Sequence, residues 1–207
     1  MSGGPVLIGI PGTELDPRSR AWLEHPAVGG VVLFSRNFVD RAQLQALVES
    51  IRDATEPRPL VCIDQEGGRV QRLREGFTRL PPLGVLGRLY AGDPVKAVDM
   101  AYRHGRVMSM EMLASGIDLS FAPVLDLDRG SRVIGDRAFS PSPDVVTELG
   151  RAYLAGDAAH IHSPAGGRGM NLGIADASEW ADRLVAGTLD GYSQARHEAG
   201  AQTIGVS

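Results

Sequence analysis

Short apolar runs, each ended by a turn, alternate with longer amphipathic stretches along the first 155 residues. Four such runs predict strands: Val6 to Ile10, Gly29 to Phe34, Leu60 to Ile63 and Ile117 to Phe121. The runs are continuously apolar, a pattern typical of parallel strands in a sheet that is covered on both faces. A stretch with helical features follows each run. This order predicts an α/β fold with parallel pairing and right-handed crossovers.

Capping residues mark where the predicted helices begin. A side chain that can accept hydrogen bonds from free N–H groups, often followed by proline, precedes each helical stretch at Asp16-Pro17, Asp40, Asp93-Pro94 and Ser142-Pro143. We expect the first helix to end near Glu24, the third at Ser115 with Gly116 as its left-handed terminator, and the fourth near Leu154. The second helix has the clearest apolar face, formed by Leu44, Leu47, Val48 and Ile51.

Composition narrows the class of protein. Hydrophobic residues make up 43% and charged residues 22% of the 207 residues, which is typical of a soluble globular chain. The formal charge of −4 argues against a dedicated nucleic-acid binder, because such a protein needs a basic surface. No apolar run approaches the ~20 residues of a membrane helix. The start lacks a basic signal segment, and the lone Cys62 excludes an internal disulfide, so we expect a cytoplasmic protein.

The polar segments that leave the strand ends are where chemistry is expected. In a parallel sheet these ends lie at one edge, where sites gather. Asp64 comes directly after the third strand, partly desolvated and in need of hydrogen-bond donors. The Gly67-Gly68 pair permits a tight bend, so Arg69 and Arg72 can fold back to the same place. Two interpretations stay open, a carboxylate that binds sugar hydroxyls and a structural Asp–Arg pair.

A long ordered series of motifs makes residues 1–155 similar to one family. The motifs are Gly12 to Leu15, His25 to Gly30, Leu33 to Phe38, Ile63 to Arg72, Arg74 to Pro81, Asp118 to Asp126 and Ile134 to Phe139. They resemble the β-N-acetylhexosaminidases of glycoside hydrolase family 3, enzymes of peptidoglycan recycling. The resemblance implies a TIM barrel and retaining hydrolysis with a carboxylate nucleophile and a His–Asp acid/base. It also implies that Asp64, Arg72 and Arg137 bind the terminal N-acetylglucosamine.

Parts of that family's pattern do not occur in the 207 residues. The Lys-His-Phe-Pro-Gly-His-Gly segment and the Ser-Asp-Asp segment with the nucleophile are absent, and a closed barrel typically takes ~250 residues. We therefore expect a truncated half-barrel of four β/α units over residues 1–155 and a helical tail over residues 156–207. Such a chain would bind an N-acetylglucosamine-containing muropeptide or saccharide without catalytic residues of its own. Its unpaired sheet edges would favour self-association.

The tail carries a second resemblance. Residues 154–200 resemble the second FAD motif of the aromatic-ring flavoprotein monooxygenases, which implies flavin-binding roles for Asp157, Gly167, Gly169 and Asn171. No Gly-x-Gly-x-x-Gly turn follows the first strand, as the FAD pyrophosphate would require. We therefore expect no cofactor, with an FAD-dependent oxidoreductase fragment as the alternative. A further alternative is that residues 156–196 are an insertion, because residues 197–205 again resemble the hydrolase.

Other candidate residues favour structural roles. His160 and His162 lack further ligands at suitable spacing, so no metal site is expected. His104 is expected on a solvated or half-buried helix face, Cys62 as a small buried residue, and Glu66 as part of the loop structure.

Overall fold

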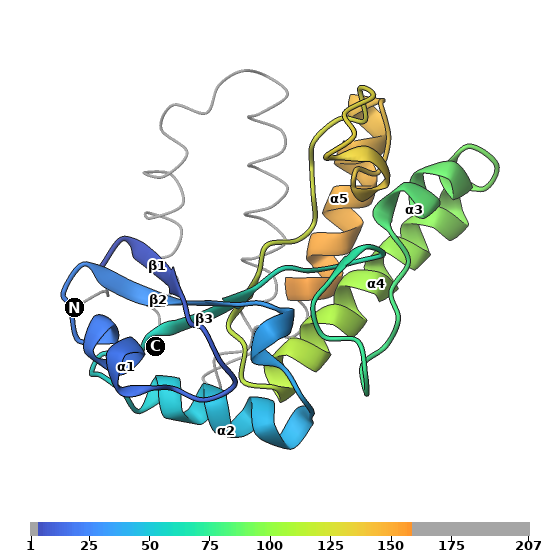
Figure 1. Cartoon of the computed structure of the whole chain (residues 1–207). Helices are drawn as coiled ribbons and strands as arrows, with labels where there is room; N and C mark the ends of the chain where they lie inside the picture. Colours follow the sequence, from blue (N-terminus) through green and yellow to red (C-terminus); the bar gives the residue numbers. More distant parts are fainter. Residues whose placement is uncertain (1–3, 159–207) are drawn as a thin grey trace, which may run out of the picture.

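Four parallel strands form the main sheet of the computed structural model, which describes residues 4–158 (Figure 1). In chain order they are β1 (Val6–Gly9), β2 (Val28–Leu33), β3 (Leu60–Ile63) and β6 (Leu119–Ser120). Their order across the sheet is β1-β2-β3-β6, so each new strand is added on the same side. The predicted α/β class with a parallel sheet is confirmed.

The pairing of β3 with β6 determines where the polar segments that follow these two strands leave the sheet. Ile63 pairs with Ser120, and the backbone N–H of Phe121 donates to the Ile63 carbonyl at 2.9 Å. At the other end, Asp118 donates its N–H to the Val61 carbonyl at 2.8 Å. Only Leu119–Ser120 has strand geometry, so β6 is shorter than the predicted run. Asp64 and the segment after Phe121 nevertheless start side by side.

The helices begin at the predicted caps. They are α1 (Pro17–Leu23), α2 (Arg41–Arg52), α4 (Pro94–Ala114) and α5 (Pro143–Ala158). The carboxylates of Asp16, Asp40 and Asp93 each accept a hydrogen bond from a backbone N–H of the first turn, which stabilises the helix start. Gly116 ends α4 with φ +75°, as expected. None of the helices within residues 4–158 is both long enough and apolar enough to span a membrane.

The segment between β3 and α4 contains more structure than its polarity predicts. A hairpin of β4 (Gln65–Gly67) and β5 (Val70–Gln71) follows β3, and α3 (Leu83–Tyr90) precedes α4. Gly67 and Gly68 form the bend with φ +108° and +56°, a region that favours glycine. Strands of two or three residues are too short to give a periodic signal. Helix α3 lacks a side-chain cap because Pro82 precedes it. Two 3-10 turns, η1 (Ser35–Asn37) and η2 (Gly135–Arg137), lie after β2 and before α5.

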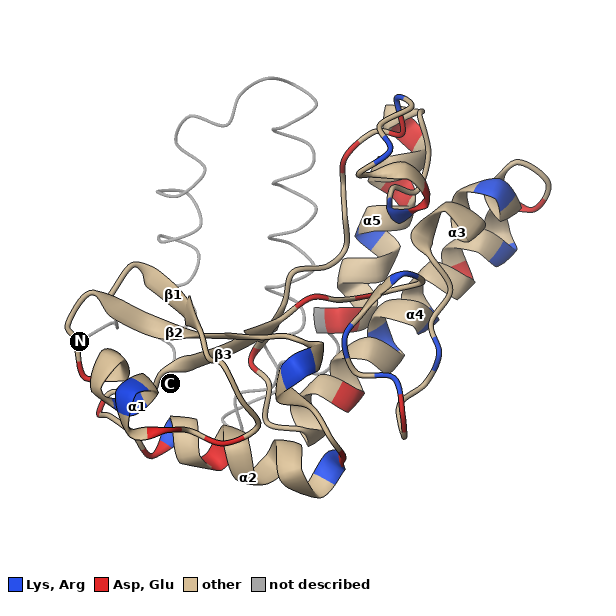
Figure 2. Cartoon of the chain, in the orientation of Figure 1, with Lys and Arg blue, Asp and Glu red and all other residues tan. Residues whose placement is uncertain are grey.

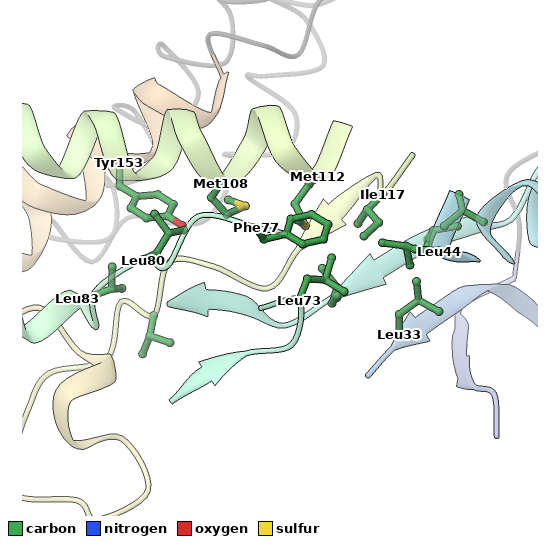
Figure 3. Packing of buried hydrophobic residues seen from close by; sticks show 14 of the residues in the cluster. Leu33, Leu44, Leu73, Phe77, Leu80, Leu83, Met108, Met112, Ile117 and Tyr153 are labelled. Carbon is green, nitrogen blue, oxygen red and sulfur yellow. The ribbon is translucent and has the colours of Figure 1, made fainter. Parts of the chain in front are cut away.

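The core joins the sheet to α4 and α5. Figure 3 shows Met108 and Met112 of α4 pointing toward Phe77 and the loop after the hairpin. The two helices approach closely through glycine, because a Cβ at Gly105 would lie 2.2 Å from the Tyr153 carbonyl oxygen. Tyr153 is thereby fully buried against α4.

The outer strands depart from the prediction that the sheet is covered on both faces. Val61, Cys62 and Ile63 of β3 are fully buried, so the expectation for Cys62 is confirmed. In β1, however, Val6 is 45% and Leu7 is 38% exposed. The prediction of a buried first strand is therefore wrong, because within residues 4–158 no strand pairs with the outer edge of β1.

Candidate functional site

Asp64 and Arg72 form an ion pair at the carboxyl end of β3. Asp64 is the first residue after the strand, and the hairpin returns the chain so that Arg72 Nη2 lies 2.8 Å from Asp64 Oδ2. The predicted return of Arg72 is confirmed. The Asp64 side chain stays 26% and the Arg72 side chain 29% exposed. Both groups therefore remain accessible to a ligand while paired.

A second pair joins Glu66 to Arg137. Arg137 Nη2 lies 2.6 Å from Glu66 Oε1, and Arg137 Nε lies 2.8 Å from Glu66 Oε2. Such two-point, charge-assisted pairs are stronger than single hydrogen bonds between neutral groups. The Glu66 side chain is only 3% exposed. The expectation that Glu66 is loop structure is wrong, because β4 turns its side chain toward Arg137, which comes 71 residues later.

The two pairs lie close enough to interact. The pKa of Arg137 is raised, chiefly by its hydrogen bonds to Glu66 and further by the charges of Glu66, Asp64 and Asp126. Partial burial opposes this shift. The structure thus brings Asp64, Arg72 and Arg137 together at one end of the sheet. Figure 2 shows that the loops in this part of the molecule carry both acidic and basic residues.

Two buried glutamines hold the hairpin and the loop that follows it. Gln65 Oε1 accepts hydrogen bonds from the backbone N–H groups of Arg72 and Leu73, both at 3.0 Å. The Gln71 side chain donates to the carbonyls of Leu73 and Thr78. The backbone of Arg72 is therefore fixed independently of its ion pair. Neither glutamine was predicted as a site residue, although both flank the Gly67-Gly68 bend on opposite strands.

The aromatic ring of Phe34 forms one wall of the site. Phe34 follows β2, and its ring centroid lies 5.7 Å from the Arg72 guanidinium carbon and 4.5 Å from that of Arg36. Arg36 Nε donates to the Ile10 carbonyl at 3.1 Å, which ties this wall to β1. Among the described residues, Arg72 Nε is buried and has no hydrogen-bond partner. One buried donor of the Arg72 guanidinium is thus left without a partner in this part of the chain.

His104 supports the second pair from α4. The expectation of a solvated or half-buried face is wrong: His104 is 4% exposed because α5 covers it, with the Tyr153 ring 5.2 Å away. His104 Nε2 lies 3.0 Å from the Glu66 carbonyl oxygen. A carbonyl only accepts, so we assign the proton to Nε2. Burial lowers the pKa of His104 to about 4, so the ring is neutral at neutral pH. Its position seven residues after Ala97, on the buried face, was a signal for burial.

Arg69 does not join Asp64. Its guanidinium donates instead to the Val133 carbonyl and lies 3.7 Å from the Asp136 carboxylate. The expectation that it folds back to the same place as Arg72 is therefore wrong. Arg69 ties the hairpin to the loop that carries Arg137.

Three of the four residues of the flavin alternative lie outside the described residues: Gly167, Gly169 and Asn171. His160 and His162 lie outside them as well. Asp157 is described, near the end of α5, where burial raises the pKa of its carboxyl. Within residues 4–158, no group of three or more His, Cys, Asp or Glu side chains could hold a metal ion.

Comparison with known proteins gives the family. Residues 8–204 match the N terminal domain of glycosyl hydrolase family 3. The chain belongs to this family. It is 57% identical over 152 residues to a beta-hexosaminidase of Stenotrophomonas maltophilia, a match that covers 73% of this chain and 45% of that protein. A beta-hexosaminidase of Xylella fastidiosa is 55% identical with the same coverage. The family 3 chain thus spans less than half the length of these relatives.

Solved structures agree. NagZ from Neisseria gonorrhoeae is 44% identical and superposes with a TM-score of 0.74, over 76% of this chain and 47% of that one. The same protein has been solved with N-trifluoroacetyl-D-glucosamine. A family 3 beta-N-acetylglucosaminidase from Paenibacillus has a TM-score of 0.66 at 32% identity, over 73% of this chain and 29% of that one. The family 3 match includes the tail to residue 204, and the flavoprotein resemblance gains no support.

Proposed function

We propose that this chain supplies the sugar-binding part of a family 3 β-N-acetylhexosaminidase, and that Asp64, Arg72 and Arg137 bind a terminal N-acetylglucosamine. The observation that carries the proposal is the convergence of the Asp64–Arg72 and Glu66–Arg137 pairs beyond β3. The relatives named beta-hexosaminidase and the NagZ structure with a glucosamine derivative support the substrate class.

The free hydrogen-bonding positions suit a neutral polyol. Among the described residues, Asp64 Oδ1 accepts no hydrogen bond, and Arg137 Nη1 has only a long contact of 3.4 Å to the Val133 carbonyl. A carboxylate oxygen accepts from a hydroxyl, and a guanidinium N–H donates to a neighbouring hydroxyl oxygen. A sugar with adjacent hydroxyl groups satisfies both at once.

We assign residues 1–155 to the N-terminal half of a TIM-type barrel, with residues 156–207 as a further segment. The substrate would be a muropeptide or saccharide from peptidoglycan recycling, a cytoplasmic process that suits a free cysteine such as Cys62. Hydrolysis uses water and needs no cofactor. The 207 residues do not contain the acid/base and nucleophile segments implied by the resemblance, so we propose that this polypeptide by itself binds without cleaving.

The open strands β1 and β6 bear on the state of this polypeptide in solution. Both end the described sheet, and β1 exposes Val6 and Leu7. An unpaired strand presents free N–H and C=O groups to another chain. We propose that a second copy of this chain occupies these edges.

Titration with N-acetylglucosamine tests the sugar-binding proposal. We expect chemical-shift changes on the 207-residue chain that Asp64→Ala weakens about tenfold, the size of one lost charged hydrogen bond. Asp99→Ala is the matched control, because Asp99 forms an exposed pair with Arg103 on α4. Unchanged binding in Asp64→Ala would remove Asp64 from the site. Rapid hydrolysis of a chromogenic N-acetylglucosaminide would show that the chain has a nucleophile of its own.

A further inference from the structure

Glu66 places Arg137 by holding one complete edge of its guanidinium. Both oxygens of the carboxylate are occupied, by Nε and Nη2 of Arg137 at 2.8 and 2.6 Å. A guanidinium is planar and rigid, so fixing the Nε–Nη2 edge also fixes the direction of Nη1. That nitrogen is the donor of Arg137 that keeps only a long backbone contact.

Glu66 is itself fixed from two sides. Its backbone carbonyl accepts the Nε2–H of His104 in α4, and the side-chain oxygen of the preceding residue, Gln65, accepts the backbone N–H of Arg72 just after β5. The carboxylate is buried, and a buried charge is stable only with a partner. Arg137 is that partner, so neither residue can leave the pair without leaving the other uncompensated.

The charges around Arg137 indicate which other contacts the Glu66–Arg137 pair prevents. Asp64 and Asp126 are close enough to raise the pKa of Arg137. Without Glu66, the guanidinium would be drawn toward these two carboxylates. A bond from Arg137 to Asp64 would occupy the oxygen that Arg72 leaves free. Each oxygen of Asp64 would then accept from a guanidinium, which leaves fewer acceptor positions for a ligand.

We propose that Glu66 is a positioning residue that keeps Arg137 away from Asp64, so that Asp64 Oδ1 and Arg137 Nη1 both stay free for adjacent hydroxyl groups. The sugar-binding part of this inference rests on the proposed function. The position of Arg137 does not, and it can be measured without a ligand.

The first experiment follows the Nε–H signal of Arg137 by ¹⁵N NMR in the 207-residue chain. We expect a slowly exchanging signal that Glu66→Gln abolishes, because the neutral amide offers one acceptor where the carboxylate offers two. Asp99→Asn is the matched control and should leave the Arg137 signal unchanged, since it alters only the exposed pair with Arg103. A persistent slow signal in Glu66→Gln would overturn the proposal.

The second experiment measures N-acetylglucosamine affinity in a double-mutant cycle. Glu66→Gln should weaken binding about tenfold and should add nothing in the background of Arg137→Ala. An equal loss in both backgrounds would overturn the proposal, because Glu66 would then act on packing and not through Arg137. If the unmodified chain does not bind the sugar, the proposed function fails, while the NMR experiment still decides the role of Glu66.

A second variant keeps the test decisive if Glu66→Gln does not fold. Glu66→Asp retains the carboxylate but shortens the side chain by one methylene, which moves the charge away from Arg137. We expect it to fold, with faster exchange of the Arg137 Nε–H than in the unmodified chain. Exchange as slow as in the unmodified chain would contradict a positioning role.

Discussion

The imidazole of His104 lies 5.2 Å from the ring of Tyr153, and within the described residues neither His104 Nδ1 nor the Tyr153 hydroxyl has a hydrogen-bond partner. Burial raises the pKa of Tyr153 and lowers that of His104 to about 4. Both groups are therefore neutral at neutral pH. The two rings pack in the interface between α4 and α5, where one polar atom of each is buried without a hydrogen bond. Protonation of His104 would place a charge in this interface.

The first prediction concerns acid stability. His104 binds its proton less readily in the folded chain than at the ordinary pKa of 6.5, so the unfolded state takes up more protons between about pH 6.5 and 4. The free energy of unfolding should therefore fall across this window as pH decreases, by up to about 3 kcal/mol from this group. His104→Gln should flatten the slope in urea denaturation, whereas His25→Gln, an exposed control, should not. An unaltered slope in His104→Gln would contradict a buried neutral imidazole.

Asp157 should change the free energy of unfolding with pH in the direction opposite to His104. Burial raises the pKa of its carboxyl, so the folded state binds the proton more readily and loses stability as pH rises through that pKa. Asp157→Asn removes the buried charge and keeps the shape. We expect the variant to be more stable than the parent at neutral pH, with the difference shrinking in acid. Thermal denaturation at both pH values measures it, and a destabilised variant at neutral pH would refute the prediction.

The contact between α4 and α5 depends on the absence of a side chain at Gly105. A Cβ there would lie 2.2 Å from the Tyr153 carbonyl oxygen, a backbone atom that cannot move alone. Gly105→Ala should lower the free energy of unfolding by about 2 kcal/mol or more, in spite of the better helix propensity of alanine. Gly92→Ala is the control, because a Cβ there would lie 3.9 Å from the Leu89 carbonyl oxygen, an ordinary van der Waals contact. Equal stabilities would show that the helices separate without strain.

The exposed edge of β1 leads to a prediction about association. Light scattering of the 207-residue chain should show a mass above that of the monomer, which decreases on dilution. Leu7→Lys places a charge on the edge strand and should shift the chain toward monomer. Val133→Lys, on an exposed residue of the loop before η2, should leave the mass unchanged. A monomer at all concentrations would contradict pairing of the edges.

The local parts of the fold could be predicted from the sequence. Asp16, Asp40 and Asp93 cap their helices as expected because a capping signal acts within three residues. The strand β3 and the position of Asp64 at its end follow from a bounded apolar run. These features need no information from distant residues.

The long-range parts of the site could not be predicted. Glu66 differs from a surface loop residue only through Arg137, 71 residues later, and no local pattern shows that pairing. Arg69 and Arg72 look equivalent after the glycine bend, yet only Arg72 meets Asp64. The Gln65 side chain holds the backbone of Arg72, whereas the Arg69 side chain is held by Val133 and Asp136.

The hydrogen bonds that Gln65 and Gln71 form within the hairpin and the loop after it have a thermodynamic consequence for ligand binding. Hydrogen bonds from the side-chain amides of Gln65 and Gln71 hold the segment up to Thr78 to its own backbone without any ligand. If this segment binds a saccharide as we propose, little loop ordering is needed on binding, which lowers the entropic penalty of association. For such a ligand, we expect discrimination between epimers to depend on how each hydroxyl fits the fixed oxygens and nitrogens more than on contact area.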